Sequence, residues 1–224
     1  SEACDVLEKA EDFDLAVHDL IKKYASEHQR IVFNGNGYSE EWVEEAARRG
    51  LPNIRTMVEA IPVLTEEKTI ELFEKFKVFT RAELESRAEI QYETYSKAIN
   101  IEARSMIDIA SKHIIPAVLQ YTTALATSIN QIREACTEAN ISVQIELLKE
   151  CSSLLAATKA ALKELTEVTE TAAAKPEGRE RAVYIQDMVV PAMEALRRPV
   201  DRLEMLVAKE MWPMPSYGDL LFEV

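Results

Sequence analysis

Leu147–Ala172 reads LLKECSSLLAATKAALKELTEVTETA, and its apolar and small residues recur at alternating steps of four and three. The recurring positions are Leu147, Cys151, Leu154, Thr158, Ala161, Leu165, Val168 and Ala172. Because a helix makes one turn every 3.6 residues, this spacing gathers the recurring residues into one narrow seam. The stretch therefore predicts a long helix that packs along its length against other helices.

Two further seams flank this stretch. The preceding seam consists of Ile107, Ile114, Val118, Tyr121, Leu125, Ile129 and Ile132. The following seam consists of Ala182, Ile185, Val189, Ala192, Leu196, Val200, Leu203 and Val207. The breaks between seams, Thr137–Ser142 and Ala174–Gly178, are short enough to require antiparallel neighbours.

The three seams predict a long antiparallel three-helix bundle from about Arg104 to Met211. Its expected core includes Leu125, Ile132, Leu154, Leu165, Ile185 and Leu196. Pro116, Pro191 and Pro199 fall inside the helical pattern. Each lacks an amide proton and should kink its helix locally without ending it.

The N-terminal part is more broken and contains one demanding loop. Arg30–Phe33 has the pattern of a short extended run, and Asn34-Gly35-Asn36-Gly37 follows it. Two consecutive Asn-Gly steps predict a tight turn with positive φ. Ser39 and Gly50 are then expected to begin and end a short helix.

Capping boxes and the chain's last residues complete the predicted fold. Thr56 with Glu59, and Thr80 with Glu83, have the spacing of capping boxes. The tail from Trp212 to Val224 is expected to be non-helical, ordered and packed, with Leu220–Phe222 pairing as a short strand with Ile31–Phe33. The predicted fold is all-α, with a small N-terminal helical part carrying one tight extended loop, a long antiparallel three-helix bundle and a non-helical C-terminal tail.

Composition excludes several classes of partner. The chain has 224 residues and a formal net charge of -13, which opposes binding to nucleic acid or anionic lipid. The longest stretch without charge, His113–Ile132, contains too many polar residues to span a membrane. Cys4, Cys136 and Cys151 fit a reducing, cytoplasmic compartment and small buried side chains. The chain has no initiator Met and opens directly in a helical pattern; processing could remove a Met, but a cut from a longer polypeptide explains both features.

No complete catalytic, cofactor or metal site is predicted in this chain. His18, His28 and His113 lie in neither a Glu-x-x-His nor a HExxH pattern, so structural histidines are favoured over ligands. The loop at residues 34–37 lacks the third Gly of a dinucleotide fingerprint and the Gly-Lys-Ser/Thr of a P-loop. A structural turn is favoured there over a ligand site. The abundant carboxylates are typical of solvated helix faces.

One stretch resembles a known family. Residues 30–42, RIVFNGNGYSEEW, with Glu45-Ala46 and Arg49–Leu51, resemble the C-terminal region of the large, type III glutamine synthetases. The resemblance continues at Tyr95–Lys97, Ile101–Ala103, Ile115–Ala117, Asp201–Glu204 and Trp212–Phe222. It implies a parent enzyme that makes glutamine from glutamate and ammonia with ATP and Mg²⁺ (or Mn²⁺).

The resemblance also implies a division of labour. Residues 1–29 resemble the closing helix of the catalytic domain, 30–103 a short-helix subdomain, 104–211 the bundle and 212–224 the tail. The expected partners are the upstream catalytic domain and other subunits of a homo-oligomer. None of the family's catalytic motifs is found in this sequence, so no catalytic residue is carried over.

The expected contact with the catalytic body is the loop near the junction, with Asn34, Gly35, Asn36, Gly37, Tyr38 and Trp42. An independent helical protein-interaction module is the alternative, and an enzyme complete within this chain ranks third. An upstream catalytic region in the same reading frame would distinguish the first hypothesis from the second.

Overall fold

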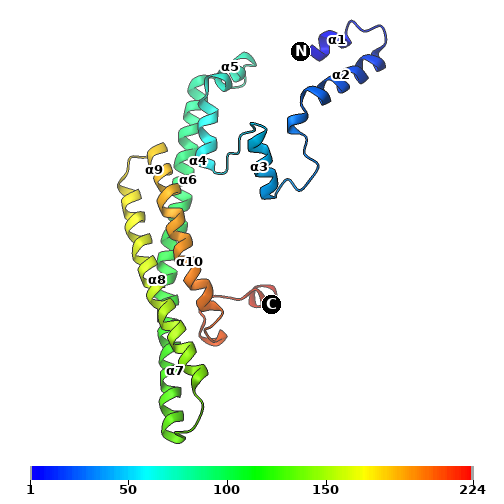
Figure 1. Ribbon diagram of the computed structural model, residues 1–224. Coiled ribbons are helices and arrows are strands. Elements are labelled where there is room, and N and C mark those ends of the chain that lie inside the picture. Colours follow the sequence, from blue (N-terminus) through cyan, green and yellow to red (C-terminus); the bar gives the residue numbers. More distant parts are fainter. Residues whose placement is uncertain (1, 223–224) are drawn as a thin grey trace. The chain divides into compact units, whose positions relative to one another are not determined.

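The computed structural model describes residues 2–222, without the side chain of Tyr217 (Figure 1). Within these residues every regular element is a helix and none is a strand, which confirms the all-α prediction. The chain divides into two compact units, Ser1–Arg55 and Thr56–Val224. Each unit has its own packing and is described by itself.

The first unit is a series of short helices with almost no core. Its elements are α1 (Glu2–Leu7), α2 (Phe13–Glu27), the 3-10 helix η1 (Gln29–Ile31) and α3 (Glu40–Arg48). Asp12 caps α2 by accepting a hydrogen bond from the Leu15 amide at 3.0 Å. Among its described residues only Leu20 and Ala46 are buried.

The predicted cap at Gly50 is confirmed. Gly50 has φ of 71°, and its amide donates to the Ala47 carbonyl while the Leu51 amide donates to the Ala46 carbonyl. These two bonds form a Schellman motif, in which a glycine with positive φ satisfies the last carbonyls of a helix.

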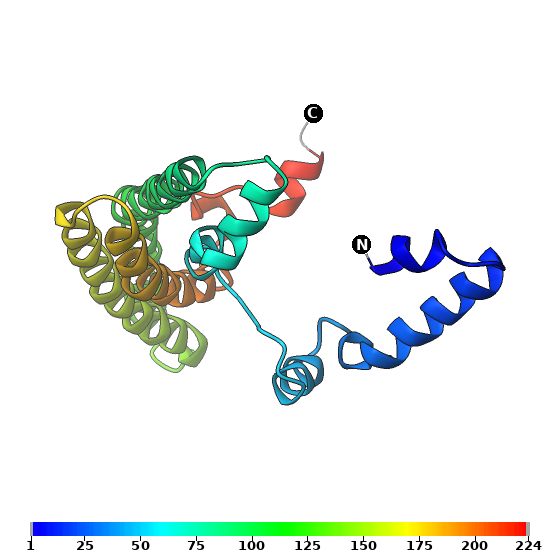
Figure 2. The ribbon, with the colours of Figure 1, turned by 90° about the horizontal axis from the view of Figure 1, so that it is seen from above.

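The second unit is built around three long helical columns, and the predicted three-helix bundle is confirmed. The first column is α6 (Arg81–Ile109), the π-helix η3 (Ala110–Ile114) and α7 (Ile115–Ala135). The second is α8 (Ser142–Ala174), and the third is α9 (Arg179–Tyr184), the π-helix η4 (Ile185–Val189) and α10 (Val190–Glu204). The α8 helix packs on both α7 and α10, and the view from above shows the columns side by side (Figure 2).

The predicted seams form the core. Leu165, Ile185 and Leu196 are 0–2% exposed, whereas Leu125, Ile132 and Leu154 are half-buried. One cluster of buried residues fills the middle of the bundle: Ala103, Ala110, Leu162, Leu165, Ala172, Ile185, Val189, Ala192 and Leu196. A second cluster, of Ile114, Val118, Cys151, Leu203 and Val207, continues toward α7.

The first column begins at Arg81, well before Arg104, where we expected the bundle to begin. Thr80 and Glu83 start it with a reciprocal capping box, as predicted. The helix then crosses residues 103 and 104 without interruption. Leu84, Ala88 and Tyr92 are buried near its start, so this part of α6 belongs to the packed unit.

Two of the three prolines follow a short π-helix, where a simple kink was predicted. Pro116 follows η3 and Pro191 follows η4, each as the second residue of the next α-helix. A proline ring clashes with the carbonyl four residues earlier, and a wider π-turn relieves that clash. Pro199, by contrast, lies inside α10.

Short helices close the α6 end of the bundle. These are α4 (Met57–Ala60), the 3-10 helix η2 (Ile61–Thr65) and α5 (Glu67–Lys75). Val58 and Ile61 pack with Ala88, Tyr92 and Ala182, so α4 and η2 join α6 to α9. Thr56 caps α4 by accepting from the Glu59 amide at 3.2 Å.

The end of α5 stores backbone strain at Lys77. Lys77 has φ of 54°, and the Val78 amide donates to the Phe73 carbonyl as in a Schellman motif. We expect Lys77→Gly to raise the free energy of unfolding by about 0.5–1 kcal/mol, because the left-handed conformation costs a side-chain-bearing residue more than glycine loses in entropy.

Urea unfolding measures the change at Lys77. Lys75→Gly, the same replacement two residues earlier inside α5, is the control and should lower stability by up to about 1 kcal/mol. Equal effects of the two glycines would refute the strain at Lys77.

The tail corrects two predictions. Trp212–Ser216 are not in an α-helix, but Tyr217–Phe222 form the short helix α11, so the tail is neither wholly non-helical nor a strand paired with Ile31–Phe33. Ser216 and Asp219 start this helix, since the Asp219 carboxylate accepts from the Ser216 amide at 2.7 Å and from its hydroxyl at 2.8 Å. The Lys209 ammonium and these donors lower the pKa of Asp219 to about 2.

Packing of the tail is also only partly as expected. Trp212 packs against the cluster of Ile114 and Val118, as predicted. Leu220, Leu221 and Phe222 are 67%, 71% and 79% exposed, so the prediction that they are covered is wrong. Glu223 and Val224 lie outside the described residues.

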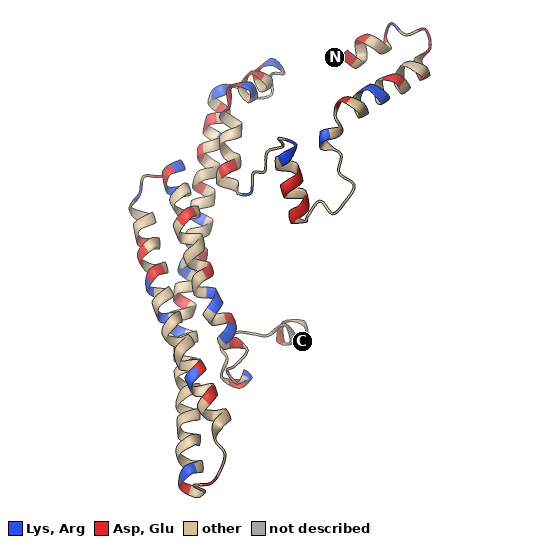
Figure 3. Ribbon diagram, viewed as in Figure 1, with Lys and Arg blue, Asp and Glu red and all other residues tan. Residues whose placement is uncertain are grey.

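The uncharged stretch of α7 keeps its polar groups within the helix. Thr123 and Thr127 donate their hydroxyls to the carbonyls of Leu119 and Thr123, four residues earlier. The stretch is free of Lys, Arg, Asp and Glu between His113 and Ile132 (Figure 3). In the part of the chain that the structure describes, no helix has the length and apolarity needed to cross a membrane.

Candidate functional site

The predicted contact loop in the first unit is organised around an aromatic pair. Phe33, just before the loop, stacks on Trp42 of α3, with ring centroids 4.5 Å apart. A Cβ on Gly35 would lie 2.7 Å from the Phe33 ring, so any larger residue there would have to displace that ring. The stack therefore joins the start of the loop to the helix after it.

Asn36 makes the turn itself. Its side-chain oxygen accepts from the Tyr38 amide at 3.0 Å, and its carbonyl accepts from the Ser39 amide at 3.1 Å and the Ser39 hydroxyl at 2.8 Å. Neither Gly35 nor Gly37 has positive φ, so that prediction was wrong. Ser39 does precede α3, but its hydroxyl serves Asn36 instead of capping the helix.

Arg49, which follows α3, forms hydrogen bonds to the backbone of residues 30–32 before the loop. Its guanidinium donates to the Val32 carbonyl at 2.6 Å and to the Arg30 carbonyl at 3.3 Å. The same group donates to Glu45 at 2.5 Å and lies 5.6 Å from the centre of the Trp42 ring. One side chain thus holds two backbone carbonyls, a carboxylate and an aromatic face.

Glu45 is shared between two arginines. Arg48 donates to it at 2.5 and 2.6 Å and Arg49 at 2.5 Å, and these bonds lower the pKa of Glu45 to about 2. Because the folded pKa is lowered, this contribution to stability is present above the ordinary pKa of a glutamate and is lost as pH falls toward 2. The arrangement is therefore intact at neutral pH.

The six candidate residues divide into a supporting and a presented set. Trp42 and Asn36 hold the loop, and Gly35 accommodates the Phe33 ring. Asn34 and Gly37 are exposed, and Tyr38 is 100% exposed at the tip. The loop thus presents a full aromatic side chain on a braced backbone.

Sequence reasoning missed the residues that brace this loop. Arg49 and Glu45 were not among the candidates, although Glu45 with Arg49 has the spacing of a helical ion pair. That spacing was the available signal. The contacts of Arg49 with Val32, 17 residues away, have no counterpart in local sequence pattern.

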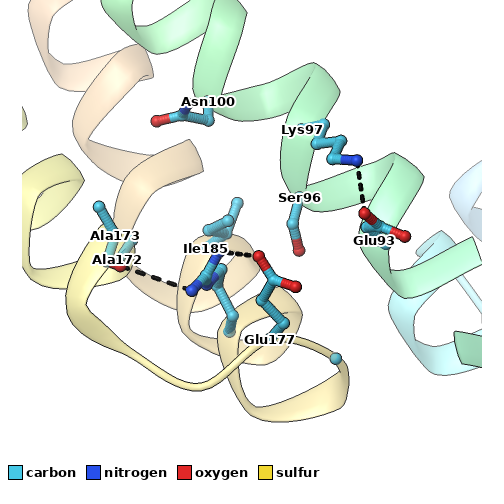
Figure 4. A pocket seen from close by; sticks show the side chains of 10 residues that line it. Glu93, Ser96, Lys97, Asn100, Ala172, Ala173, Glu177 and Ile185 are labelled. Carbon is cyan, nitrogen blue, oxygen red and sulfur yellow. Dashed lines mark hydrogen bonds and ion pairs between the residues drawn. The ribbon is translucent and has the colours of Figure 1, made fainter. Parts of the chain in front are cut away.

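The second unit contains a small cavity of mixed polarity where α6 passes the turn between α8 and α9 (Figure 4). Its volume is about 110 Å³, and Ser96, Lys97, Glu177 and Arg181 are among its lining residues. Lys97 pairs with Glu93, and Arg181 donates to Glu177 at 3.3 Å. The buried Ser96 hydroxyl has no partner within the described residues.

This cavity lacks the elements of a catalytic centre. Both of its basic groups are already paired, and Arg181 also donates to the Lys175 carbonyl at 3.0 Å, which closes the turn. No nucleophile lies beside a base among its lining residues. A few water molecules suit its size and its mixed polarity.

Metal ligands are not brought together in the described chain. Between residues 2 and 222 no three His, Cys, Asp or Glu side chains form a group that could hold a metal ion. The three histidines are exposed, Cys151 is buried, and Cys4 and Cys136 are exposed, contrary to the expectation of buried cysteines.

Comparison with known proteins gives a consistent result. Residues 16–133, more than half of the chain, match the family described as the glutamine synthetase C-terminal domain. The chain is 34% identical over 208 residues to a glutamine synthetase of Butyrivibrio fibrisolvens and 34% over 213 residues to one of Bacteroides fragilis. It is also 34% identical over 215 residues to a type-3 glutamine synthetase of Dictyostelium discoideum.

Coverage in these comparisons is strongly asymmetric. The alignments take in 93%, 93% and 92% of this chain but only 30%, 29% and 29% of the three relatives. The chain therefore spans less than a third of the length of the curated relatives it matches.

Proposed function

Because the chain belongs to the glutamine synthetase family, we propose that it is the C-terminal helical assembly segment of an enzyme that ligates ammonia to glutamate with ATP. In this role the segment contributes no catalytic residue. It supports the catalytic region and supplies contacts between subunits of a cytoplasmic homo-oligomer.

The observation that carries this proposal is the bare apolar surface of the first unit. Phe13, Leu15 and Ile21 of the α2 region are 59%, 58% and 63% exposed, and Ile31 and Val32 before the loop are 62% and 54% exposed. A helix of this length is marginal in water without an apolar surface to pack on. The surface that covers it is, in our proposal, the catalytic region that the relatives carry in the other two thirds of their length.

The braced loop belongs to the same contact. Tyr38 is fully exposed on a backbone held by Asn36, Arg49 and the Phe33–Trp42 stack. A rigid aromatic side chain loses little entropy on docking and buries a large area. We place Tyr38 at the centre of the contact with the catalytic region.

A second surface suits contacts between subunits. A groove of about 720 Å³ lies between α6, α10 and the tail, lined by apolar residues that include Met106, Val200 and Trp212. Leu220 of α11 lines this groove, and Leu221 and Phe222, which follow it, are exposed. Apolar patches of this kind mark protein contacts.

ATP and a divalent metal ion do not fit this chain's own residues. The described part of the chain offers neither a group of metal-ligating side chains nor a phosphate-binding loop. We therefore derive no step of the reaction through this segment and assign both groups to the remainder of the parent enzyme.

We expect the 224-residue chain to form no glutamine from glutamate, ammonia and ATP·Mg²⁺. A chimera in which this chain replaces the aligned part of the Bacteroides fragilis relative should form glutamine, because it restores the catalytic region. Hydrogen exchange on the same samples should show residues 2–55 more strongly protected in the chimera than in the chain alone.

Two outcomes would oppose this proposal. Glutamine formation by the chain alone would place catalytic residues in it. A folded chimera whose residues 2–55 exchange as fast as in the chain alone would show that the catalytic region does not cover them. In the chimera, Tyr38→Ala tests whether the loop contacts the catalytic region. Tyr24→Ala on α2, which removes a tyrosine from the same unit, is the matched control.

A further inference from the structure

The loop contains two chemically similar asparagines in different settings. Asn34 and Asn36 are each followed by glycine, whereas Asn53, Asn100 and Asn140 are followed by isoleucine and Asn130 by glutamine. A glycine nitrogen is open to approach because no Cβ shields it, whereas a β-branched neighbour is crowded and stiff. By sequence, the two Asn-Gly steps are therefore the ones at which the backbone nitrogen can most easily attack the asparagine side chain.

The structure separates these two asparagines. Asn36 is fixed by the bond from the Tyr38 amide to its side chain and by the two bonds from Ser39 to its carbonyl. Asn34 is exposed, and within residues 2–222 no hydrogen bond involves its side chain or the Gly35 amide. Asn34 thus has an exposed carboxamide that no hydrogen bond fixes, beside a backbone nitrogen that donates to no acceptor within the described residues.

We propose that Asn34 is a self-acting deamidation site and that Asn36, two residues away, is protected by its turn. The Gly35 amide nitrogen loses its proton to water or hydroxide and attacks the side-chain carbonyl carbon of Asn34. The new nitrogen–carbon bond closes a succinimide ring as the bond to the amide nitrogen breaks and ammonia leaves. Water then opens the ring to an aspartate or, through the other carbonyl, to an isoaspartate.

The same geometry explains why the two sites differ. The Tyr38 amide nitrogen lies 3.0 Å from the side-chain oxygen of Asn36 and donates a hydrogen bond to it. This bond must break before the ring can close at Asn36. The need to break one such bond before the ring closes slows the reaction about fivefold, and the need to break the Ser39 bonds as well slows it further. Asn34 has no bond of this kind to release.

Deamidation at Asn34 adds a negative charge to residues 31–39, a segment without Asp, Glu, Lys or Arg. A carboxylate replaces the carboxamide one residue from the Phe33–Trp42 stack, and an isoaspartate also lengthens the backbone there by one carbon. This inference concerns the loop's own chemistry and holds whether or not the loop contacts a catalytic region.

The experiment follows both asparagines in one sample. The 224-residue chain is incubated at mildly alkaline pH, and peptides are analysed by mass spectrometry for the mass difference between an amide and a carboxyl. The same chain in concentrated urea gives the reference in which neither turn exists. We expect similar rates in urea and, in the native chain, Asn34 about fivefold or more ahead of Asn36.

Variants assign the signal and test the cause. Asn34→Gln should abolish the change at position 34, because the longer side chain closes a six-membered ring far more slowly, and should leave only the slower change at Asn36. Asn36→Asp retains the acceptor for the Tyr38 amide and should leave the rate at Asn34 unchanged. Equal native rates at the two sites, or a faster Asn36, would overturn the proposal, and so would an Asn34 no faster than the isoleucine-flanked asparagines.

Discussion

Leu165→Ala is expected to lower the free energy of unfolding of the bundle by about 2–5 kcal/mol. Leu165 is 0% exposed and belongs to the middle core cluster, where it meets residues of all three columns. Truncation removes three carbon atoms from a site enclosed by helices, which resist collapse into the space. The lost transfer free energy and the cavity therefore add.

Urea unfolding followed by the helical circular dichroism signal measures this cost. Leu119→Ala in α7 is the matched control, since Leu119 is the same residue type in the same bundle but 50% exposed. Its loss should stay below about 1 kcal/mol, because half of its surface is already in water. A cost below about 0.5 kcal/mol for Leu165→Ala would mean that the seam faces solvent.

The bundle was predictable because its seams use strongly apolar residues at regular steps. The capping box of Thr80 with Glu83 predicted the start of α6, but the bundle seam was not predicted to extend back to it, and the reason lies in Ala88, Ser96 and Ala103. These residues are buried in α6 at seam positions, but two are small and one is polar. Close helix packing favours such small residues, which mark a seam less clearly than Leu, Ile or Val do.

In the loop, the sequence pattern failed to predict the backbone conformation for a different reason. Asn-Gly steps are typical of positive φ, yet the side chain of Asn36 replaces the backbone turn that the pattern predicted. The Phe33 ring then decides that Gly35 is needed for space and not for φ. Both effects depend on contacts that the spacing of residues does not reveal.

The prediction for the tail was wrong because of local hydrogen bonding. Its apolar residues predicted a buried extended segment, whereas Ser216 and Asp219 form a helix cap with each other and with Lys209. The cap starts α11 through these hydrogen bonds, and Leu220 stays 67% exposed although it lines the groove between α6, α10 and the tail. Local hydrogen bonding therefore outweighs the expected burial of Leu220 and Phe222 in this chain.

Arg49→Met is expected to release the loop while leaving its sequence intact. The change removes the donors to the Val32 and Arg30 carbonyls, the bond to Glu45 and the charge beside Trp42. Met retains most of the apolar stem, so the loss is mainly that of a guanidinium. A hydrogen bond from a charged donor contributes about 1.5–3 kcal/mol, so opening of the loop should become about 30-fold more frequent.

Amide exchange at Val32 and Ser39 reports this opening, because both amides donate to carbonyls within the loop region, at 3.0 and 3.1 Å. Arg48→Met is the matched control: Arg48 shares Glu45 with Arg49, but its side chain is 74% exposed, and its two side-chain hydrogen bonds go only to Glu45. An exposed ion pair contributes little, so exchange should change less than about fivefold. Equal acceleration by both variants would show that the ion pair with Glu45, and not the contact of Arg49 with the backbone, holds the loop.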